Sequence, residues 1–446
     1  MAYSSKNGRR PDENASKISH SHIINDKDVK EFISNCAYPK SKEEIHLDPS
    51  LLIDIEYPKD NNVDLIVAVD GGYTTVSVKK TFPSSQISFF QIGTLVLKTE
   101  DLNSLSEKPF ISRESMSKLK ELERDKLVLP TKNVAYKENL TLTNSVRQCI
   151  YEYFKNKKDK NTLLETLYWF LFEIYRDENI IFQLANCPNC GNKIELNKED
   201  FNKYYISKSC KCNQNIYLTD VFRFNEVIDD ELGAGGILGY LTNILEHFNI
   251  IHTIKFILAN KPDLLKNILF IKDGPLAFFG QTARLHLPMR NLCNFLFKNY
   301  NVLLVGLEKS GAFVEHAEEI KDMEAFKLGH AYLLNNKHIY KYILPGDPDT
   351  PNPYANTSYY SSKLIFKSKQ GRMHVITLPV ENENIVLNPE KLDFKNIDVI
   401  LDNIEKLRCD MYDNSIIPVA LANKLISLSN HPSSILLEKF SKSFMK

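Results

Sequence analysis

Two aspartates stand where apolar runs of the sequence end, and glycine follows each of them. Asn267–Gly280 reads NILFIKDGPLAFFG and carries Asp273, while Val63–Val78 reads VDLIVAVDGGYTTVSV and carries Asp70. Short apolar runs bounded by turn residues predict buried strands, and glycine lets a backbone and a ligand approach closely. Two carboxylates at the mouths of two strands therefore predict a binding site for divalent metal ions.

Further acidic residues are available to complete such a site. Two-metal hydrolysis of a phosphodiester needs several carboxylates around cations that lie about 3.5–4 Å apart. Glu308 follows the next buried strand, and either Glu231 or Glu246 on the intervening helical segment supplies another ligand. Lys309 is placed to contact the scissile phosphate as a point charge. The alternative for each acid alone is a solvated turn, so the prediction depends on their combination.

Four cysteines form a second candidate metal site. Cys187 and Cys190 make a C-x2-C pair, and Cys210 and Cys212 make a C-x-C pair further along the chain. This spacing predicts a zinc ribbon, in which two hairpins present four thiolates to a structural Zn²⁺ ion. Because four thiolates leave no open coordination position, the metal is expected to stabilise a small insertion rather than to catalyse a reaction.

The composition sets limits on the class of protein. The chain has 446 residues, of which 43% are hydrophobic and 25% charged, an ordinary balance for a globular protein. The formal net charge is zero, so contact with DNA requires a local patch rather than a global field. No apolar run approaches the roughly 20 residues of a spanning helix, and the first thirty residues are polar. We expect a cytoplasmic protein without membrane contact.

The pattern of apolar residues predicts a mixed α/β architecture. We expect a strand up to Asp70, a turn at the two following glycines, and strands over 75–79 and 85–98 in an antiparallel meander. The charged segment Ser112–Lys126 is typical of an exposed helix. Later, helices alternate with the strands that end near Asp273 and Glu308, which predicts that these two strands are parallel.

Three segments in this order resemble the motifs of NurA-type nucleases: AVDGGYTT, KDGPLAFFG and GLEKSGAF. The resemblance covers roughly Val63 to Ser429. It implies an RNase H-like mixed sheet flanked by helices, here with an inserted zinc ribbon and a helical C-terminal segment. It also implies a manganese-dependent or magnesium-dependent nuclease that acts on DNA ends and single strands. The implied partners are a second copy of the chain and a HerA-type hexameric ATPase, in DNA end processing or defence against foreign DNA.

The resemblance also assigns roles by position. Asp70 and Asp273 match the two metal-binding aspartates of the family, and Lys309 matches a lysine that follows the third strand. Glu231 or Glu246 would stand for the family's helix glutamate.

One departure concerns the C-terminal segment, where the family carries a tyrosine and a histidine in the active site. SIIPVALAN places Ser415 and Asn423 at those positions. His316 and His374 are the remaining candidates for the missing histidine ligand.

The same resemblance divides the chain into segments. A polar tail and lead-in precede the core, the core is interrupted by a helical and zinc-ribbon insertion, and a short tail follows it. The expected boundaries are 1–60, 61–160, 161–225, 226–430 and 431–446.

Two other functions are compatible with the sequence. The absent histidine suggests a catalytically inactive NurA-like scaffold that loads DNA into a translocase. DGGYTTVSV also resembles the phosphate-binding hairpin of actin-like and sugar-kinase-like ATPases. Against this, the second phosphate loop of those ATPases is rich in glycine, whereas the corresponding segment here contains Pro275 and two phenylalanines.

Overall fold

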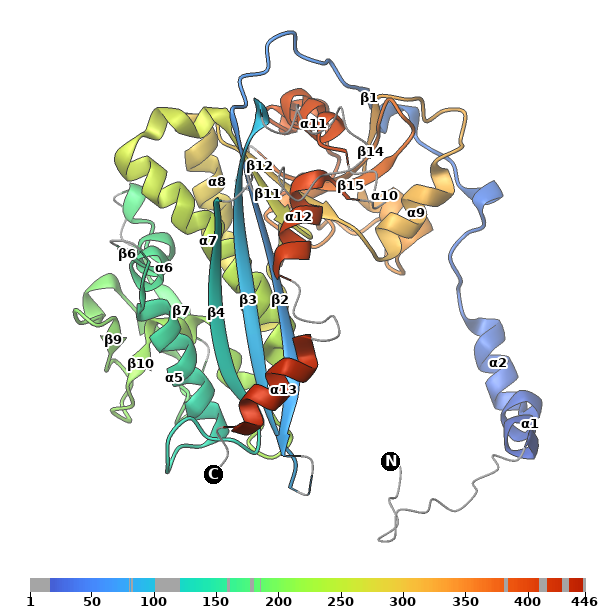
Figure 1. Cartoon of the computed structure of the whole chain (residues 1–446). Coiled ribbons are helices and arrows are strands. Elements are labelled where there is room, and N and C mark those ends of the chain that lie inside the picture. The colour runs from blue at the N-terminus through green and yellow to red at the C-terminus, as the bar shows by residue number, and fades with distance from the viewer. Residues whose placement is uncertain are drawn as a thin grey trace.

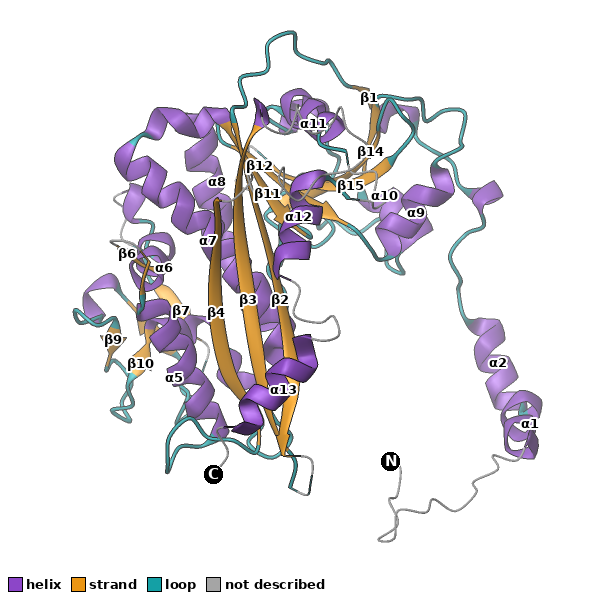
Figure 2. Ribbon diagram, in the orientation of Figure 1, coloured by secondary structure: helices purple, strands orange, loops and turns teal. Residues whose placement is uncertain are grey.

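The fold is built around one large mixed sheet (Figure 2). The computed structural model describes residues 17–79, 81, 83–100, 121–158, 161–176, 180–184, 186–380, 384–408, 415–426 and 433–443. The strands of the large sheet are β1 (Leu52–Asp54), β2 (Leu65–Lys79), β3 (Ser85–Lys98), β4 (Glu121–Lys132), β11 (Ile268–Asp273), β12 (Leu303–Glu308), β13 (His330–Leu333), β14 (Ser361–Lys367) and β15 (Met373–Pro379).

The strand order of this sheet is β1-β13-β14-β15-β12-β11-β2-β3-β4. β2, β3 and β4 form an antiparallel meander, and β11 and β12 continue the sheet from β2 as parallel strands. β15 then joins β12 in the antiparallel direction. The expected RNase H-like mixed sheet, with the two aspartate-bearing strands side by side, is confirmed.

The expected turn after Asp70 is absent, because β2 runs without interruption from Leu65 to Lys79. Asp70, Gly71 and Gly72 all pair with residues of β3 in one continuous register. The meander therefore consists of β2, β3 and β4 rather than of two short strands and β3. The two glycines sit inside a strand, where they permit close approach of other groups instead of reversing the chain.

The prediction of a helix over Ser112–Lys126 is also wrong in the part of that segment that the structure describes. Residues 121–126 belong to β4 and pair with β3, while residues 101–120 lie outside the described part of the chain. β4 is an edge strand, so its charged side chains can face solvent while its backbone pairs on one side. Strand pairing here overrides the local preference of a charge-rich sequence for helix.

Helices cover both faces of the sheet (Figure 1). One apolar core joins β2, β3 and β4 to the helices between Leu142 and Tyr300, and a second joins the central strands to later helices. The helices of the body are α5 (Leu142–Lys155), α6 (Leu163–Leu171), α7 (Leu238–Asn260), α8 (His286–Tyr300), α9 (Ala312–Ile320), α10 (Asn336–His338), α11 (Ile397–Lys406), α12 (Ile417–Ile426) and α13 (Ser433–Ser443). None of the helices in the described residues is both long and apolar enough to cross a bilayer.

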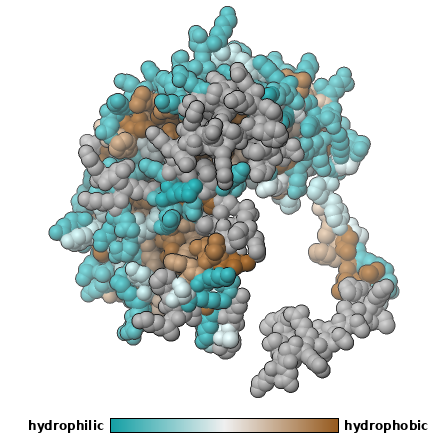
Figure 3. Space-filling view, in the orientation of Figure 1, coloured by the Kyte–Doolittle hydropathy of each residue, from teal (hydrophilic) through white to brown (hydrophobic). Residues whose placement is uncertain are grey.

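Two N-terminal helices lie apart from this body (Figure 1). They are α1 (Lys17–Asn25) and α2 (Lys27–Asn35), and Asp26 caps the second by accepting hydrogen bonds from the backbone of Asp28 and Val29. The space-filling view shows apolar side chains at the surface of this arm (Figure 3). Phe32, the most exposed of them, has 72% of its surface open to solvent.

Four short strands belong to the cysteine-containing insertion rather than to the large sheet. β7 (Phe182–Leu184) pairs with β8 (Ile194–Leu196), and β9 (Ile206–Ser207) pairs with β10 (Ile216–Tyr217), both in the antiparallel direction. A further two-stranded pair joins β5 (Lys157–Lys158) to β6 (Asn161–Thr162) ahead of α6.

Candidate active site

The two aspartates singled out from the sequence lie on adjacent strands. Asp70 is in the interior of β2 and Asp273 ends β11, and the parallel register pairs Val69 with Lys272. The two carboxyl groups are close enough to share a hydrogen bond and to influence each other electrostatically. Glu246, from the middle of α7, acts on both of them. Asp70, Glu246 and Asp273 are called the carboxylate group below.

Gly71 explains how a helix residue reaches the strand. A Cβ atom at this position would lie 2.8 Å from Cγ2 of Thr242 and 3.0 Å from Oε1 of Glu246. Instead, the N–H of Gly71 donates a hydrogen bond to the Glu246 carboxylate. Glycine is required here because any side chain would push α7 away from β2.

Two lysines neutralise part of the carboxylate group. Nζ of Lys272 lies 2.6 Å from Oε2 of Glu246 and donates to the backbone carbonyl oxygen of Asp273 at 2.8 Å. Nζ of Lys309 lies 2.7 Å from Oδ2 of Asp273. The side chain of Lys272 is 2% exposed, whereas that of Lys309 is 24% exposed. Only Lys309 therefore faces a molecule that approaches from solvent.

The pKa of Asp70 is strongly perturbed. Burial is the largest cause, the neighbouring Asp273 and Glu246 carboxylates add to it, and together they raise this pKa to about 8 despite the opposing effect of Lys309. Burial also raises the pKa of Glu246, against the favourable effect of Lys272. Without a further cation, Asp70 is thus mostly protonated at neutral pH.

The donor set fits a divalent cation. Within the described residues, Oδ2 of Asp70 is buried and has no hydrogen-bond partner, although buried carboxylate oxygens are normally paired. Hard divalent cations such as Mn²⁺ and Mg²⁺ prefer carboxylate oxygens. Asp70 and Asp273 are the residues that would hold such an ion.

Between the two glutamates that the sequence left open, the structure places Glu246 next to the aspartates. Glu231 is exposed in a turn closed by hydrogen bonds between Asp229 and Gly233. The neighbouring residue Ala234 bonds the backbone of Thr131 near the far end of β4. That end is seven residues along the sheet from the level of Asp70, roughly 23 Å at the usual rise per residue.

Glu308 is also directed elsewhere. Its carboxylate forms an ion pair with the buried Nζ of Lys363, which lies 4.2 Å from the ring centroid of Phe313. Glu308 is not among the groups that shift the pKa of Asp70 or Glu246. Of the two charged residues in this motif, Lys309 rather than Glu308 reaches Asp273.

The C-terminal segment does return to the sheet near Asp70. α12 packs against β2 and β3, on the face opposite to α7. Ser415 is buried just before this helix, and Asn423 is exposed on it. The position at which the NurA resemblance would place a histidine therefore carries an amide that faces solvent.

Neither of the two candidate replacement histidines joins the carboxylate group. Nε2 of His316 lies 2.8 Å from Nε2 of His338 in a buried contact between α9 and α10. The ring of His374 stacks on Phe366 in the β14–β15 hairpin, and burial lowers its pKa to about 4. Both side chains are buried, and Nδ1 of each has no hydrogen-bond partner among the described residues.

Lys272 is the site residue that sequence reasoning missed. The available signal was a lysine directly inside the apolar run ILFIKDG, where a charged residue is unexpected. A lysine buried at such a position requires a buried partner of opposite charge. That partner, Glu246, is distant in sequence and could not be identified from spacing.

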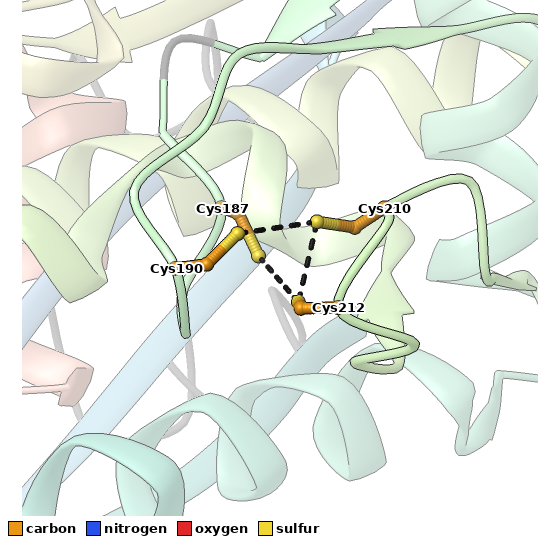
Figure 4. Close-up of side chains that lie close together, drawn as sticks. All are labelled: Cys187, Cys190, Cys210 and Cys212. Carbon is orange, nitrogen blue, oxygen red and sulfur yellow. Dashed lines mark hydrogen bonds between the residues drawn. The ribbon is translucent and has the colours of Figure 1, made fainter.

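The four cysteines Cys187, Cys190, Cys210 and Cys212, called the cysteine cluster below, converge as predicted (Figure 4). Among the described residues, they are the only group of acidic, histidine or cysteine side chains whose possible ligand atoms all lie within 4.8 Å of one another. The β7–β8 hairpin carries the first pair and the β9–β10 hairpin the second. These cysteines could hold a structural metal ion.

Local backbone geometry supports this arrangement. Gly191 has a φ of +71° and donates its N–H to the carbonyl oxygen of Cys187 at 3.0 Å, which closes the first turn. The backbone N–H of Gln214 is the largest of the effects that lower the pKa of Cys212 to about 6, whereas burial and hydrogen bonds with the other thiols raise the pKa of Cys210 to about 12. A lower thiol pKa favours the thiolate, which is the form that binds metals.

The second hairpin is fixed to the body by α5. Arg147 forms a buried two-point contact with Asp220, at 2.8 and 2.7 Å, and also donates to the backbone oxygen of Asn215 at 3.1 Å. Tyr151 stacks on Tyr217 with 4.4 Å between ring centroids. The cysteine cluster is thus anchored to the core helices, although it is separate from the carboxylate group.

Comparison with known proteins gives limited matches. No known family model matches the chain, and no curated protein sequence matches it. The chain is similar to the crystal structure of the NurA nuclease from Sulfolobus solfataricus, with 9% identity, a TM-score of 0.35 and 96% of each chain covered. It is also similar to a second crystal structure of NurA, with 11% identity, a TM-score of 0.30, and 97% of this chain and 98% of the other covered.

Proposed function

We propose that this chain is a metal-dependent DNA nuclease. The observation that carries the proposal is the contact between Asp70 and Asp273 on adjacent strands, within electrostatic reach of Glu246, beside a buried oxygen of Asp70 that lacks a hydrogen-bond partner among the described residues. A perturbed carboxyl group beside other acids and a solvent-facing lysine is typical of a catalytic site. The motifs around the two aspartates, which resemble those of NurA nucleases, narrow the reaction to phosphodiester hydrolysis in DNA.

Each residue has a distinct role in this proposal. Asp70 and Asp273 hold Mn²⁺ or Mg²⁺, and Lys309 offsets negative charge on the DNA backbone from its partly exposed position. A bound divalent cation would act as a Lewis acid, both on the phosphodiester and on a water molecule. Glu246 and Lys272 form the buried pair that holds the end of β11 and the helix together.

The cysteine cluster is proposed to bind a structural Zn²⁺ ion. Four thiolates are the ligand set that tetrahedral zinc sites use, and they leave no position for a substrate. The small hairpins around the cluster have little core of their own, so a metal ion would stabilise them.

The proposed partners come from the resemblance to NurA motifs. They are DNA, a second copy of this chain in a homodimer, and a HerA-type hexameric ATPase. The proposed role is DNA end processing or defence against foreign DNA, with exonuclease and single-strand endonuclease activity.

A direct assay tests the nuclease proposal. The purified protein is incubated with single-stranded and double-stranded DNA, with and without Mn²⁺ and with and without a HerA-type ATPase. We expect manganese-dependent degradation that Asp70→Ala and Asp273→Ala abolish while circular dichroism shows an intact fold. Cleavage by both variants at the wild-type rate would contradict the proposal.

A second candidate function is a catalytically inactive scaffold that loads DNA into a translocase. The observation that favours it is the exposed Asn423 at the position expected for a histidine. A protein that binds its ATPase partner and DNA but cleaves no DNA with either Mn²⁺ or Mg²⁺ would support it.

An ATPase of the actin or sugar-kinase type is less compatible with the fold. It requires a phosphate-binding turn at Gly71 and Gly72, and these residues lie within a continuous strand.

A further inference from the structure

Lys272 is a buried lysine beside the site that the proposed hydrolysis does not require. Its side chain is among the largest that are fully buried, and it follows directly after the apolar residues of β11. Its ammonium lies 2.6 Å from Oε2 of Glu246 and 2.8 Å from the backbone oxygen of Asp273. A buried ammonium costs free energy unless it is paired, so these contacts fix its position.

Glu246 is consequently already occupied. Lys272 contacts one oxygen of its carboxylate, and the N–H of Gly71 donates to the same carboxylate. In contrast, Oδ2 of Asp70 has no hydrogen-bond partner among the described residues. Among the three carboxylates, the oxygen left open to a metal ion therefore belongs to Asp70, while the ion-pair partner of Asp273 is the partly exposed Lys309 rather than a fully buried lysine.

The formal charges also favour one divalent cation over two. The three carboxylates, together with Lys272 and Lys309, carry a formal charge of −1. One divalent cation and one phosphodiester, which itself carries −1, bring this total to zero. A second divalent cation would leave an excess of +2 in a largely buried site, where like charges repel strongly.

We propose that the site takes a single divalent cation, held by Asp70 and Asp273, and that the buried ion pair with Lys272 keeps Glu246 out of the ligand set. This inference rests on the proposed nuclease function. It replaces the two-metal hydrolysis expected from the sequence. Lys272 is a positioning residue in this arrangement, because it orients Glu246 and the end of β11 without reaching solvent.

The number of bound Mn²⁺ ions tests the proposal without reference to activity. The full-length protein, saturated with zinc, is titrated with Mn²⁺, and free Mn²⁺ is measured by electron paramagnetic resonance. We expect one Mn²⁺ per chain for the wild type and two for Lys272→Met, which frees an oxygen of Glu246.

Two results would overturn the proposal: two Mn²⁺ ions, or none, per wild-type chain. A wild-type chain that binds two ions and cleaves DNA would remove this inference while leaving the proposed function intact. A chain that binds one ion without cleaving DNA would contradict the proposed nuclease function while leaving the inference of a single ion intact.

A second measurement covers the case in which Lys272→Met does not fold. Glu246→Gln keeps the shape of the side chain, and we expect it to weaken Mn²⁺ binding by less than about tenfold, the lower end of effects outside the direct ligands. Asp70→Asn is expected to weaken binding more than about a hundredfold, the upper end of the same range. Equal losses in the two variants would identify Glu246 as a direct ligand and contradict the proposal.

Discussion

The two candidate metal sites of this chain are built in opposite ways. The cysteine cluster consists of four identical ligands whose sulfur atoms already lie within 4.8 Å of one another, on two short hairpins. The carboxylate group is drawn from a central strand, a neighbouring strand and a helix, and lysines neutralise it in part. In the first site the surrounding structure is small and the ligands are complete. In the second the surrounding structure is extensive and the ligands are incomplete.

This difference teaches what each metal ion would contribute. A ligand set that is closed, on segments with little core, uses the free energy of metal binding for folding. A ligand set that is held by a rigid sheet and has an unpaired oxygen is already folded, so it can bind a cation and a substrate without using that free energy for folding. Loss of a ligand should therefore destabilise the first site and inactivate the second.

The largest expected effect is on DNA cleavage after a change in the carboxylate group. Asp70→Asn keeps the shape of the side chain but removes the charge that binds the cation. We expect the rate of manganese-dependent cleavage to fall at least about a thousandfold, because metal catalysis contributes several kcal/mol and about 1.4 kcal/mol is a factor of ten. Single-turnover cleavage of labelled DNA measures this rate. A loss of less than tenfold would contradict the expectation that losing a ligand inactivates the carboxylate group.

A change in the cysteine cluster is expected to act on stability rather than on the rate of cleavage. Cys210→Ser removes one thiolate ligand, and binding of structural zinc is worth on the order of 10 kcal/mol in isolated zinc-finger peptides. We expect loss of bound zinc and proteolytic cleavage within 186–217. Elemental analysis and limited proteolysis measure both.

Cys36→Ser is the control for that change, because Cys36 lies outside the cluster on the N-terminal arm. Full zinc content in Cys210→Ser would show that the four cysteines do not act as one site.

The pH dependence of stability gives a third and intermediate effect. Asp70 has a pKa near 3.8 when unfolded and about 8 when folded, so the folded state binds more protons between these values. Without added Mn²⁺ or Mg²⁺, the contribution of Asp70 to the free energy of unfolding should therefore be largest at low pH. It should be lost as pH rises through about 8. Asp70→Asn should remove this decline and be more stable than the wild type at pH 8.5.

Urea denaturation of both proteins at pH 5 and pH 8.5 measures this difference. If Asp70→Asn is less stable than the wild type at pH 8.5, the carboxyl group is not electrostatically strained in the folded protein.

The smallest expected effect concerns Glu231, which the sequence could not separate from Glu246. Because Glu231 is exposed in a turn far from Asp70, Glu231→Ala should change the free energy of unfolding by less than about 0.5 kcal/mol, as is usual for surface positions. Cleavage should stay within about twofold of the wild type, since no charge near the site changes. A large loss of cleavage in this variant would mean that the turn reaches the site in the active state.

The cysteine cluster and the aspartates could be predicted because their signals are local. Cys187 and Cys190 lie in one turn, and Cys210 and Cys212 in another, so spacing alone indicates the geometry. Asp70 and Asp273 each follow an apolar run that must be a buried strand. What could not be predicted was the course of β2, since Gly71 and Gly72 suit both a turn and a close contact with a helix.

The remaining parts of the site depend on tertiary contacts. Glu246 is identified only when α7 is placed against Gly71, and Lys272 only when its partner is known. Glu308 has the same local pattern as the aspartates, but it pairs with Lys363. Lys363 lies on β14, which comes later in the sequence. Charged residues at strand ends thus have several available partners, and the sheet order decides among them.

The parallel pairing of β2 with β11 has a consequence for biosynthesis. Asp70 and Asp273 are more than two hundred residues apart in the chain, and Lys309 is made later still. A nascent chain on the ribosome carries Asp70 long before the ribosome has added the residues that complete the site. Any chain that ends before β11, whether by premature termination or proteolysis, therefore lacks Asp273, one of the three carboxylates. The cell is exposed to the complete site only after translation has passed the whole cysteine-containing insertion.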